Sequence, residues 1–194
     1  GYLEKEEYVN ENYGTDVNCV DYAQIYNTRF TVLRKAVERL SAVQTEDYLS
    51  FLRDNAYWLN DYALFMAEKD DHKGQAYTTW EEDIRKHDTK TLENERVRLQ
   101  KNVEFYLGLQ YFFFHQWKKM REYGRKHGVY LIGDVPIYVS PDSSDIWGNP
   151  ELFQLDEDMK PTGVAGCPPD AFSADGQLWG NPLYNWDKMK DDDY

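Results

Sequence analysis

The sequence predicts an α/β chain that is mostly helical, with one buried β-strand and a long ordered loop after it. Three observations support this fold class. Apolar residues recur at helical spacing between residues 21 and 127, a short apolar run bounded by two glycines follows, and Pro, Gly, Asp and aromatic residues dominate from Pro136 onward. With 194 residues, the chain is long enough for one ordinary domain or two small ones.

The first 20 residues are polar, acidic and aperiodic, which suggests a loop or a strand. After Asp21, apolar residues at spacings of three and four predict a helix of about five turns. A second helical stretch begins at Thr45, where acidic residues occupy the first turn, and extends to about Lys69. The apolar positions of the first helix are Tyr22, Tyr26, Phe30, Leu33, Val37 and Leu40.

A charged linker at residues 69–74 separates these helices from another that opens near Trp80. The longest helical stretch follows Thr91 and ends at Gly124 and Gly128, because glycine is the usual residue after a helix C-terminus. Its apolar face is formed by Val97, Val103, Tyr106, Leu107, Phe114, Trp117 and Met120.

Residues 129–134 are predicted to form a strand buried on both faces of a parallel sheet, because Val129–Ile132 is almost wholly apolar. Since a single strand cannot satisfy its own hydrogen-bond ladder, its edges must pair with another segment, another copy of the chain, or water. Asp134 lies at the end of this strand. In a (β/α)₈ barrel, the C-terminal ends of the strands form the face that carries the chemistry.

Composition excludes several classes of protein. Acidic residues outnumber basic ones by 35 to 22, giving a net charge of −13 without a basic stripe, so no nucleic-acid partner is predicted. No apolar run approaches the roughly 20 residues that cross a bilayer, and the first residues do not resemble a signal peptide. Cys19 and Cys167 are far apart, which favours reduced thiols in a cytosolic setting.

Common catalytic and metal motifs are also missing from the sequence. Its four histidines lack metal-ligand spacing, and neither a GxSxG elbow nor a phosphate-binding loop is present. The acidic groups at 81–83 and 142–145 lack the alternating register of a calcium loop. No metal and no cofactor are therefore predicted. The histidines are His72, His87, His115 and His127.

The region from Gly133 to Trp186 carries a dense and ordered series of motifs. They are Gly133-Asp134-Val135-Pro136-Ile137-Tyr138-Val139, Asp142-Ser143-Ser144-Asp145-Ile146-Trp147, Pro150-Glu151-Leu152-Phe153, Gly166-Cys167-Pro168-Pro169-Asp170-Ala171-Phe172-Ser173 and Gly176-Gln177-Leu178-Trp179-Gly180-Asn181-Pro182-Leu183-Tyr184. This series resembles the 4-alpha-glucanotransferases (amylomaltases, or disproportionating enzymes) of the alpha-amylase clan. Upstream, the segments at 58–65 and 110–117 are also similar to that family, so the resemblance covers roughly residues 45–190.

The resemblance implies that the chain is a fragment of a (β/α)₈ TIM barrel. Residues 21–127 would be a helical subdomain inserted before the third barrel strand, and residues 128–194 that strand with the loops of the substrate cleft. The family's first two strands have no counterpart upstream, so the chain is expected to be a middle portion of a longer protein whose remaining barrel would be its partner.

The resemblance also assigns substrate-binding residues. Asp134 matches an Asp in the donor-sugar pocket, and residues 168–179 match a mobile loop that grips the glucan. Trp147 would either stack on a glucosyl ring or pin the loop. The full set of substrate-binding candidates is Asp134, Tyr138, Asp145, Trp147, Asp170, Phe172, Ser173, Gln177, Trp179 and Asn181. Ala171 replaces a Tyr found in many members, and with Cys167 it resembles a cytosolic branch that uses maltose and branched glucans.

Family members use a retaining mechanism, in which an Asp nucleophile and a Glu acid/base stand about 5–5.5 Å apart. The nucleophile's Arg-x-Asp-His-Phe-Arg pattern is missing here. Asp71-His72 is similar but lacks the flanking Arg and Phe, so no catalytic residue is assigned. The parent is expected to transfer alpha-1,4-glucan or glucosyl units between maltooligosaccharides, while this chain alone would be inactive. The alternatives are a non-catalytic alpha-glucan-binding module and a helical interaction scaffold.

Overall fold

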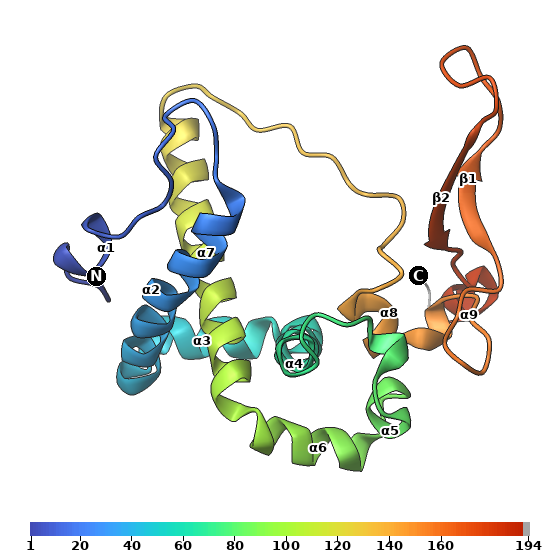
Figure 1. Cartoon of the computed structure of the whole chain (residues 1–194), viewed down its shortest axis with the longest axis horizontal. Helices are drawn as coiled ribbons and strands as arrows, with labels where there is room; N and C mark the ends of the chain where they lie inside the picture. Colours follow the sequence, from blue (N-terminus) through green and yellow to red (C-terminus); the bar gives the residue numbers. More distant parts are fainter. Residues whose placement is uncertain (192–194) are drawn as a thin grey trace. The chain divides into compact units, whose positions relative to one another are not determined.

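The computed structural model describes residues 1–191 and forms two compact units (Figure 1). The first, called here the helical unit, comprises Gly1–Ala63 and Lys101–Tyr130. The second, the hairpin unit, comprises Leu64–Gln100 and Leu131–Tyr194. The chain therefore passes from one unit to the other within two of its helices. The predicted division at residues 20/21 and 127/128 stays a prediction.

The helical unit is built from long helices. Its elements are α1 (Glu6–Val9), α2 (Tyr22–Val43), α3 (Glu46–Asp54), the first part of α4 (Ala56–Asp71) and most of α7 (Gln100–Lys126). Asp21 caps α2 by accepting from the Gln24 N–H at 2.9 Å, and Thr45 caps α3 by accepting from the Tyr48 N–H at 3.3 Å. Both caps satisfy donors that a helix N-terminus leaves free, and both helix starts are confirmed.

The core of the helical unit lies where α2, α3 and α7 meet. Leu40, Tyr48 and Tyr111 are buried there, one from each helix. Gly108 of α7 lies directly against Val37 of α2: a Cβ added to this glycine would approach the two Val37 methyl groups to 2.7 and 2.8 Å. The glycine therefore permits a closer approach of the two helices than a side chain would allow.

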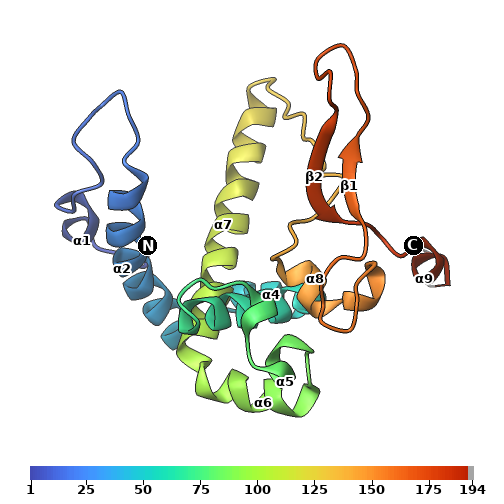
Figure 2. The same ribbon diagram turned by 45° about the vertical axis from the view of Figure 1, so that its right-hand side comes forward.

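The hairpin unit is built from short elements. They are η1 (Tyr77–Thr79), α5 (Glu82–Arg85), α6 (Thr89–Arg98), α8 (Ser144–Gly148), η2 (Pro150–Leu152), β1 (Val164–Cys167), β2 (Gln177–Pro182) and α9 (Trp186–Asp191), together with the end of α4. The two strands form an antiparallel hairpin (Figure 2). Gly166 pairs with Leu178 and Cys167 with Gln177, and the register is irregular between Val164 and Gly166.

Aromatic side chains form the core of the hairpin unit. Phe65, Tyr77, Trp80 and Trp147 are all buried, and Phe65 contacts the other three rings at centroid distances of 5.4–6.3 Å. Phe65 lies on α4 and Trp147 on α8, so this cluster joins two elements that are distant in sequence. Burial of such large rings is the main apolar contribution to this unit.

The predicted buried strand at 129–134 is wrong for the structure described here. Residues 129–136 form no regular element, and Ile132 is fully exposed. The two strands of the described residues pair only with each other, so no neighbour offers this segment a ladder. Two of its N–H groups make local bonds instead: Val129 donates to the Gly124 carbonyl at 2.9 Å and Val135 to Asp134 Oδ1 at 2.8 Å.

Other sequence predictions differ in detail. The long stretch expected after Thr91 is two helices, α6 and α7, which are separated at Leu99. Asp88, rather than a later residue, caps α6 by accepting from the Thr91 N–H at 2.8 Å. The region expected to be a long loop contains α8, η2, the hairpin and α9.

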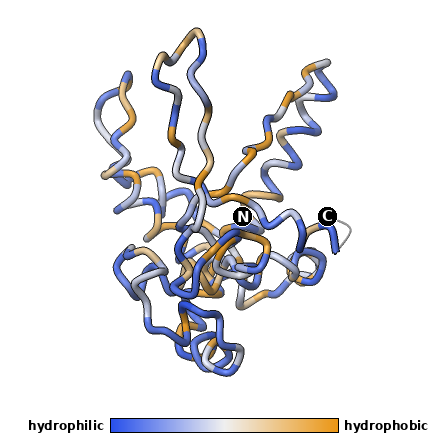
Figure 3. Tube along the Cα trace, turned by 90° about the vertical axis from the view of Figure 1, so that its right-hand side faces the viewer, coloured by the Kyte–Doolittle hydropathy of each residue, from blue (hydrophilic) through white to orange (hydrophobic). Residues whose placement is uncertain are grey.

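Hydrophobic and hydrophilic residues alternate along the helices and the hairpin (Figure 3). Among the described residues, none of the helices is both long enough and apolar enough to cross a membrane. This agrees with the absence of a long apolar run in the sequence.

Candidate functional site

The hairpin unit brings several of the predicted sugar-binding residues together beside β2. The Tyr138 ring lies 6.2 Å from the Trp179 ring and 5.7 Å from the Tyr184 ring, onto which it stacks at 17° between planes. Tyr138 is half-buried, whereas Trp179 is 45% exposed. The three rings form an aromatic group whose Trp179 face is open, as a platform for an apolar sugar face must be.

Two hydrogen bonds attach the segment before α8 to this aromatic group. Asn181 donates from Nδ2 to the Val139 carbonyl at 2.7 Å, and the Tyr184 hydroxyl donates to the Ile137 carbonyl at 3.0 Å. Both bonds bridge more than 40 positions of sequence, so they fix Tyr138 relative to β2. Gln177 accepts from the Trp179 indole N–H at 3.0 Å and orients that ring.

Asp170 organises the turn between the two strands. Its Oδ1 accepts from the backbone N–H groups of Phe172 and Ser173, both at 2.8 Å. Ser173 then donates from Oγ to the Gly176 carbonyl at 2.7 Å. This local pattern holds Phe172 at 98% exposure, because the side chain points away from a turn that is closed by its own polar groups.

Asp145 lies in the first turn of α8 and is exposed. Burial raises the pKa of Tyr184, and the negative charge of Asp145 adds to that rise. Asp145 is therefore close enough to the aromatic group to influence it electrostatically. Asp134 is exposed in the irregular segment, where its Oδ1 accepts from the adjacent Val135 N–H at 2.8 Å.

Trp147 is fully buried and cannot offer a ring face to a ligand in this structure. Its indole N–H donates to the Ile84 carbonyl at 2.8 Å, and its ring contacts Phe65, Trp80 and His87. Of the two roles considered for this residue, the burial favours pinning of the loop over stacking on a sugar.

Two functional features were not foreseen. Tyr184 completes the aromatic group, and Lys69 anchors Asp142 through a 2.6 Å ion pair. Tyr184 ends the family motif Gly176–Tyr184, and this position, two residues after Pro182, was the sequence feature that could have indicated its role. Nothing in the sequence linked Lys69 to a residue 73 positions away.

A second polar cluster in the hairpin unit joins α4, α5 and α6. Arg98 lies 2.5 Å from Glu95, 2.9 Å from Asp71 and 3.7 Å from the fully buried Glu68. Burial raises the pKa of Glu68 to about 7, and the negative charge of Glu95 adds to this rise.

His72 extends the same cluster toward the surface. Its Nε2 lies 2.8 Å from Glu81, and its Nδ1 lies 2.8 Å from the Glu68 carbonyl oxygen. Although burial opposes it, the hydrogen bond to Glu81 raises the pKa of His72. Glu68, Asp71 and His72 have ligand atoms close enough together to hold a metal ion, but the guanidinium of Arg98 already supplies a cation between the carboxylates. The cluster is therefore an ion network rather than a metal centre.

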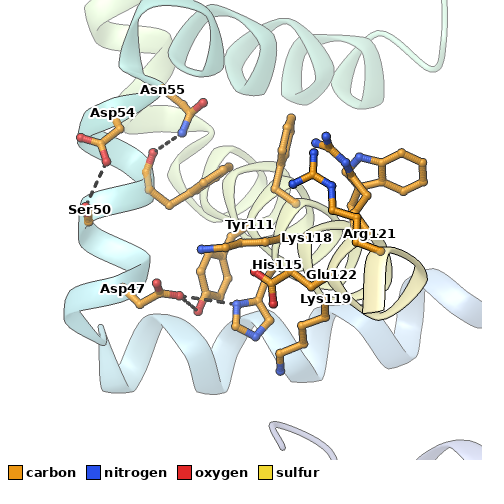
Figure 4. Close-up of a pocket in the computed structure, with 14 residues that line it drawn as sticks. Asp47, Ser50, Asp54, Asn55, Tyr111, His115, Lys118, Lys119, Arg121 and Glu122 are labelled. Carbon is orange, nitrogen blue, oxygen red and sulfur yellow. Dashed lines mark hydrogen bonds and ion pairs between the residues drawn. The ribbon is translucent and has the colours of Figure 1, made fainter. Parts of the chain in front are cut away.

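The helical unit contains a groove of about 800 Å³ between α3 and α7 (Figure 4). Tyr111 donates to Asp47 at 2.7 Å, and His115 lies 3.6 Å from the same carboxylate. Four basic residues of α7 also line the groove: Lys118, Lys119, Arg121 and Arg125. None of the predicted sugar-binding residues lines this groove, so it is separate from the candidate site.

Comparisons with known proteins bear on the fold and the family. The family described as 4-alpha-glucanotransferase matches residues 2–194. A 4-alpha-glucanotransferase of Clostridium butyricum is 41% identical over 95% of this chain and 38% of its own length. One of Streptococcus pneumoniae is 43% identical over 100% of this chain and 39% of its own length. The chain thus spans about two fifths of the length of these relatives.

The solved amylomaltase of Streptococcus agalactiae in complex with acarbose has a TM-score of 0.89 with this structure. It is 40% identical in sequence, and the match covers 99% of this chain and 39% of that one. The fold is therefore that of part of a TIM-barrel enzyme, represented here by helices and one small hairpin. The chain belongs to the 4-alpha-glucanotransferase family.

Proposed function

We propose that this chain forms a glucan-binding part of a 4-alpha-glucanotransferase. The whole enzyme would move alpha-1,4-glucan or glucosyl units between maltooligosaccharides with retention of configuration. The main support is the identity of 41–43% to 4-alpha-glucanotransferases along nearly the whole chain, together with the close fold match to an amylomaltase in complex with acarbose. Starch, glycogen and maltose are the substrate classes expected, and a cytoplasmic location goes with them.

The chemistry of the aromatic group supports a sugar ligand. An exposed indole face and nearby amide and carboxylate groups are the usual means of holding a hexose, since the ring's C–H face packs on the aromatic and its hydroxyls meet the polar groups. Trp179 supplies the face, and Asp145 and Asp170 supply acceptors. Phe172 would cover the ligand from the turn.

The same chain is proposed to be inactive without the rest of the barrel. Retaining glycosyl transfer needs one carboxylate as nucleophile and a second as acid and base. Asp170 is committed through Oδ1 to two backbone donors, and Asp134 to the N–H next to it, so both behave as binding or structural groups here. The nucleophile and the acid/base would come from residues outside this sequence.

The test is a calorimetric titration of the 194-residue chain with maltoheptaose. Binding is expected, and Trp179→Ala should weaken it roughly threefold to tenfold because a stacking surface is lost. Trp117→Ala is the matched control: its ring is 38% exposed against 45% for Trp179, but it belongs to α7 of the helical unit and is not one of the candidate residues. Equal losses in the two variants, or no binding by the parent chain, would contradict the proposal.

The activity is tested separately with maltotriose. The chain alone should produce neither longer oligomers nor glucose, whereas the gene product that contains the flanking sequence should produce both. A flanking reading frame that ends close to residue 194, with glucan binding retained, would instead favour the non-catalytic binding module.

A further inference from the structure

The ammonium group of Lys69 lies at a junction of three chain segments. It donates to the Gly74 carbonyl at 3.1 Å, the Gln75 carbonyl at 2.8 Å and the Asp142 carboxylate at 2.6 Å. An ammonium group has three hydrogens to donate, so these three acceptors use them all. The side chain is only 16% exposed, which makes its position well defined and strengthens the charge-assisted bonds.

Asp142 uses both carboxylate oxygens in this junction. Oδ2 accepts from Lys69, and Oδ1 accepts from the Tyr77 backbone N–H at 3.1 Å. The Tyr77 ring is fully buried, and burial, with a contribution from the Asp142 charge, raises its pKa to about 12. Asp142 is followed directly by Ser143, the N-cap of α8, so the junction also fixes where that helix begins.

The segment from Ile137 to Asp142 is consequently held at both ends by polar bonds. At its start, Tyr184 and Asn181 bind the carbonyl oxygens of residues 137 and 139. At its end, Asp142 is bound to Lys69 and to the Tyr77 N–H. Tyr138, which contacts both Trp179 and Tyr184, lies between the two bound carbonyls at the start of the segment.

We propose that Lys69 and Asp142 are positioning residues for glucan binding, which hold the segment 137–142 so that Tyr138 supports the open face of Trp179. This inference rests on the proposed function. Neither residue would touch the sugar. Their effect would pass along the backbone from Asp142 to Tyr138, and from there through ring contact to Trp179.

The experiment compares Lys69→Met with Asp142→Asn and with the double variant. Each single change leaves one partly buried group without its partner, and either can weaken folding as a whole. The double variant removes both charges, while the amide oxygen introduced at position 142 can still accept from the Tyr77 N–H, so it should fold. Lys90→Met, at an exposed lysine of α6 in the same unit, is the control for loss of one positive charge.

Two measurements are made at a temperature where circular dichroism shows each variant folded. The backbone NMR order parameters of segment 137–142 should fall from about 0.85 to below about 0.6 in the double variant, because one of the two anchors is gone. The affinity for maltoheptaose should fall by roughly threefold to tenfold, the same range as removal of the Trp179 ring. Lys90→Met should change neither quantity.

The variant Leu92→Ala distinguishes a purely structural role, because it changes a buried core residue of α6 in the same unit. This variant should lower the melting temperature and leave the affinity for maltoheptaose unchanged. If the double variant binds maltoheptaose as tightly as the parent, or if the order parameters at 137–142 stay the same, the positioning role is wrong. If the parent chain does not bind maltoheptaose while the order parameters at 137–142 still fall in the double variant, the proposed function fails and the anchor itself is upheld.

Discussion

The two units of this chain are stabilised in different ways. In the helical unit, long helices meet through apolar contacts, and Gly108 of α7 lies against the methyl groups of Val37 of α2. In the hairpin unit, short elements are joined by single polar bonds over long sequence distances, such as Lys69 to Asp142 and the Trp147 indole to the Ile84 carbonyl.

This difference explains where the candidate site lies. Interdigitated helices offer few exposed polar groups of defined position, whereas loops anchored at both ends present side chains on a rigid support. The predicted sugar-binding residues that come together are all in the hairpin unit, and the polar anchors hold them. The comparison can be tested by breaking one contact of each type.

The largest effect is expected from Trp147→Ala. This change removes a fully buried ring, its contacts with Phe65 and Trp80, and the hydrogen bond to Ile84. Large-to-small changes of this kind cost about 3–5 kcal/mol of unfolding free energy. Urea denaturation followed by circular dichroism measures the loss. Trp147→Phe should recover part of it, and a loss of under about 1 kcal/mol for the alanine variant would show that the ring is not a core element.

Glu68→Gln is expected to change how the stability depends on pH. Burial raises the folded-state pKa of Glu68 to about 7 from an ordinary value of 4.5, so the folded chain keeps a proton that the unfolded chain releases. This stabilising contribution is complete below pH 4.5 and is lost as pH rises through about 7. The loss is on the order of 3 kcal/mol.

The unfolding free energies of the parent and of Glu68→Gln are measured at several pH values between about 4 and 8. The difference between them isolates the contribution of Glu68, because the other titrating groups affect both proteins equally. The stability of the variant relative to the parent should rise across that interval. Glu93→Gln is the control, since that carboxylate is exposed and lies on α6 of the same unit. A difference between parent and Glu68→Gln that does not vary with pH would mean that Glu68 has the same pKa in the folded and the unfolded chain.

Gly108→Ala tests the contact type that defines the helical unit. In an exposed helix interior this change is stabilising by roughly 1 kcal/mol, but here the new Cβ would meet Val37 at 2.7 Å. We expect a net loss of about 1–2 kcal/mol from overpacking. Combined with Val37→Ala, the loss should be less than the sum of the two single changes, because the space made by one is filled by the other. Additive losses would place the strain elsewhere.

The sequence was sufficient where local signals determine the structure. Asp21 and Thr45 are N-caps because each has a side-chain oxygen that reaches a free N–H three residues later, and both helix starts were predicted. The period of α2 was equally clear, since its apolar stripe is a property of one continuous segment. The family motifs between Gly133 and Tyr184 were also readable without a structure.

The features that the sequence did not predict depend on contacts between residues that are distant in the chain. The apolar run at 129–132 has the composition of a buried strand, but burial depends on neighbours that the described residues do not supply. An aromatic residue at position 147 suits either a sugar platform or a loop pin, and only its bond to Ile84, 63 positions away, separates the two. The hairpin needs Gly166, where an added Cβ would lie 2.6 Å from the Gln177 carbonyl oxygen, and this approach is visible only once the strands are paired.

The smallest effect on stability is expected from Arg39→Ala, which removes an exposed polar bond from the apolar helical unit. Arg39 of α2 binds both carboxylate oxygens of Glu7 at 2.6 and 2.8 Å, and this hydrogen bond lowers the pKa of Glu7 to about 2. The pair holds α1, a helix of four residues without buried side chains, so its loss should release α1 and leave the melting temperature nearly unchanged.

Since the pKa of Glu7 is lowered, the attachment is present above pH 4.5 and is lost as pH falls through about 2. In Arg39→Ala the NMR titration of Glu7 should return toward 4.5, and hydrogen exchange should accelerate only at Glu6–Val9. A drop in melting temperature like that of Gly108→Ala would instead show that the helical unit, too, depends on a polar anchor.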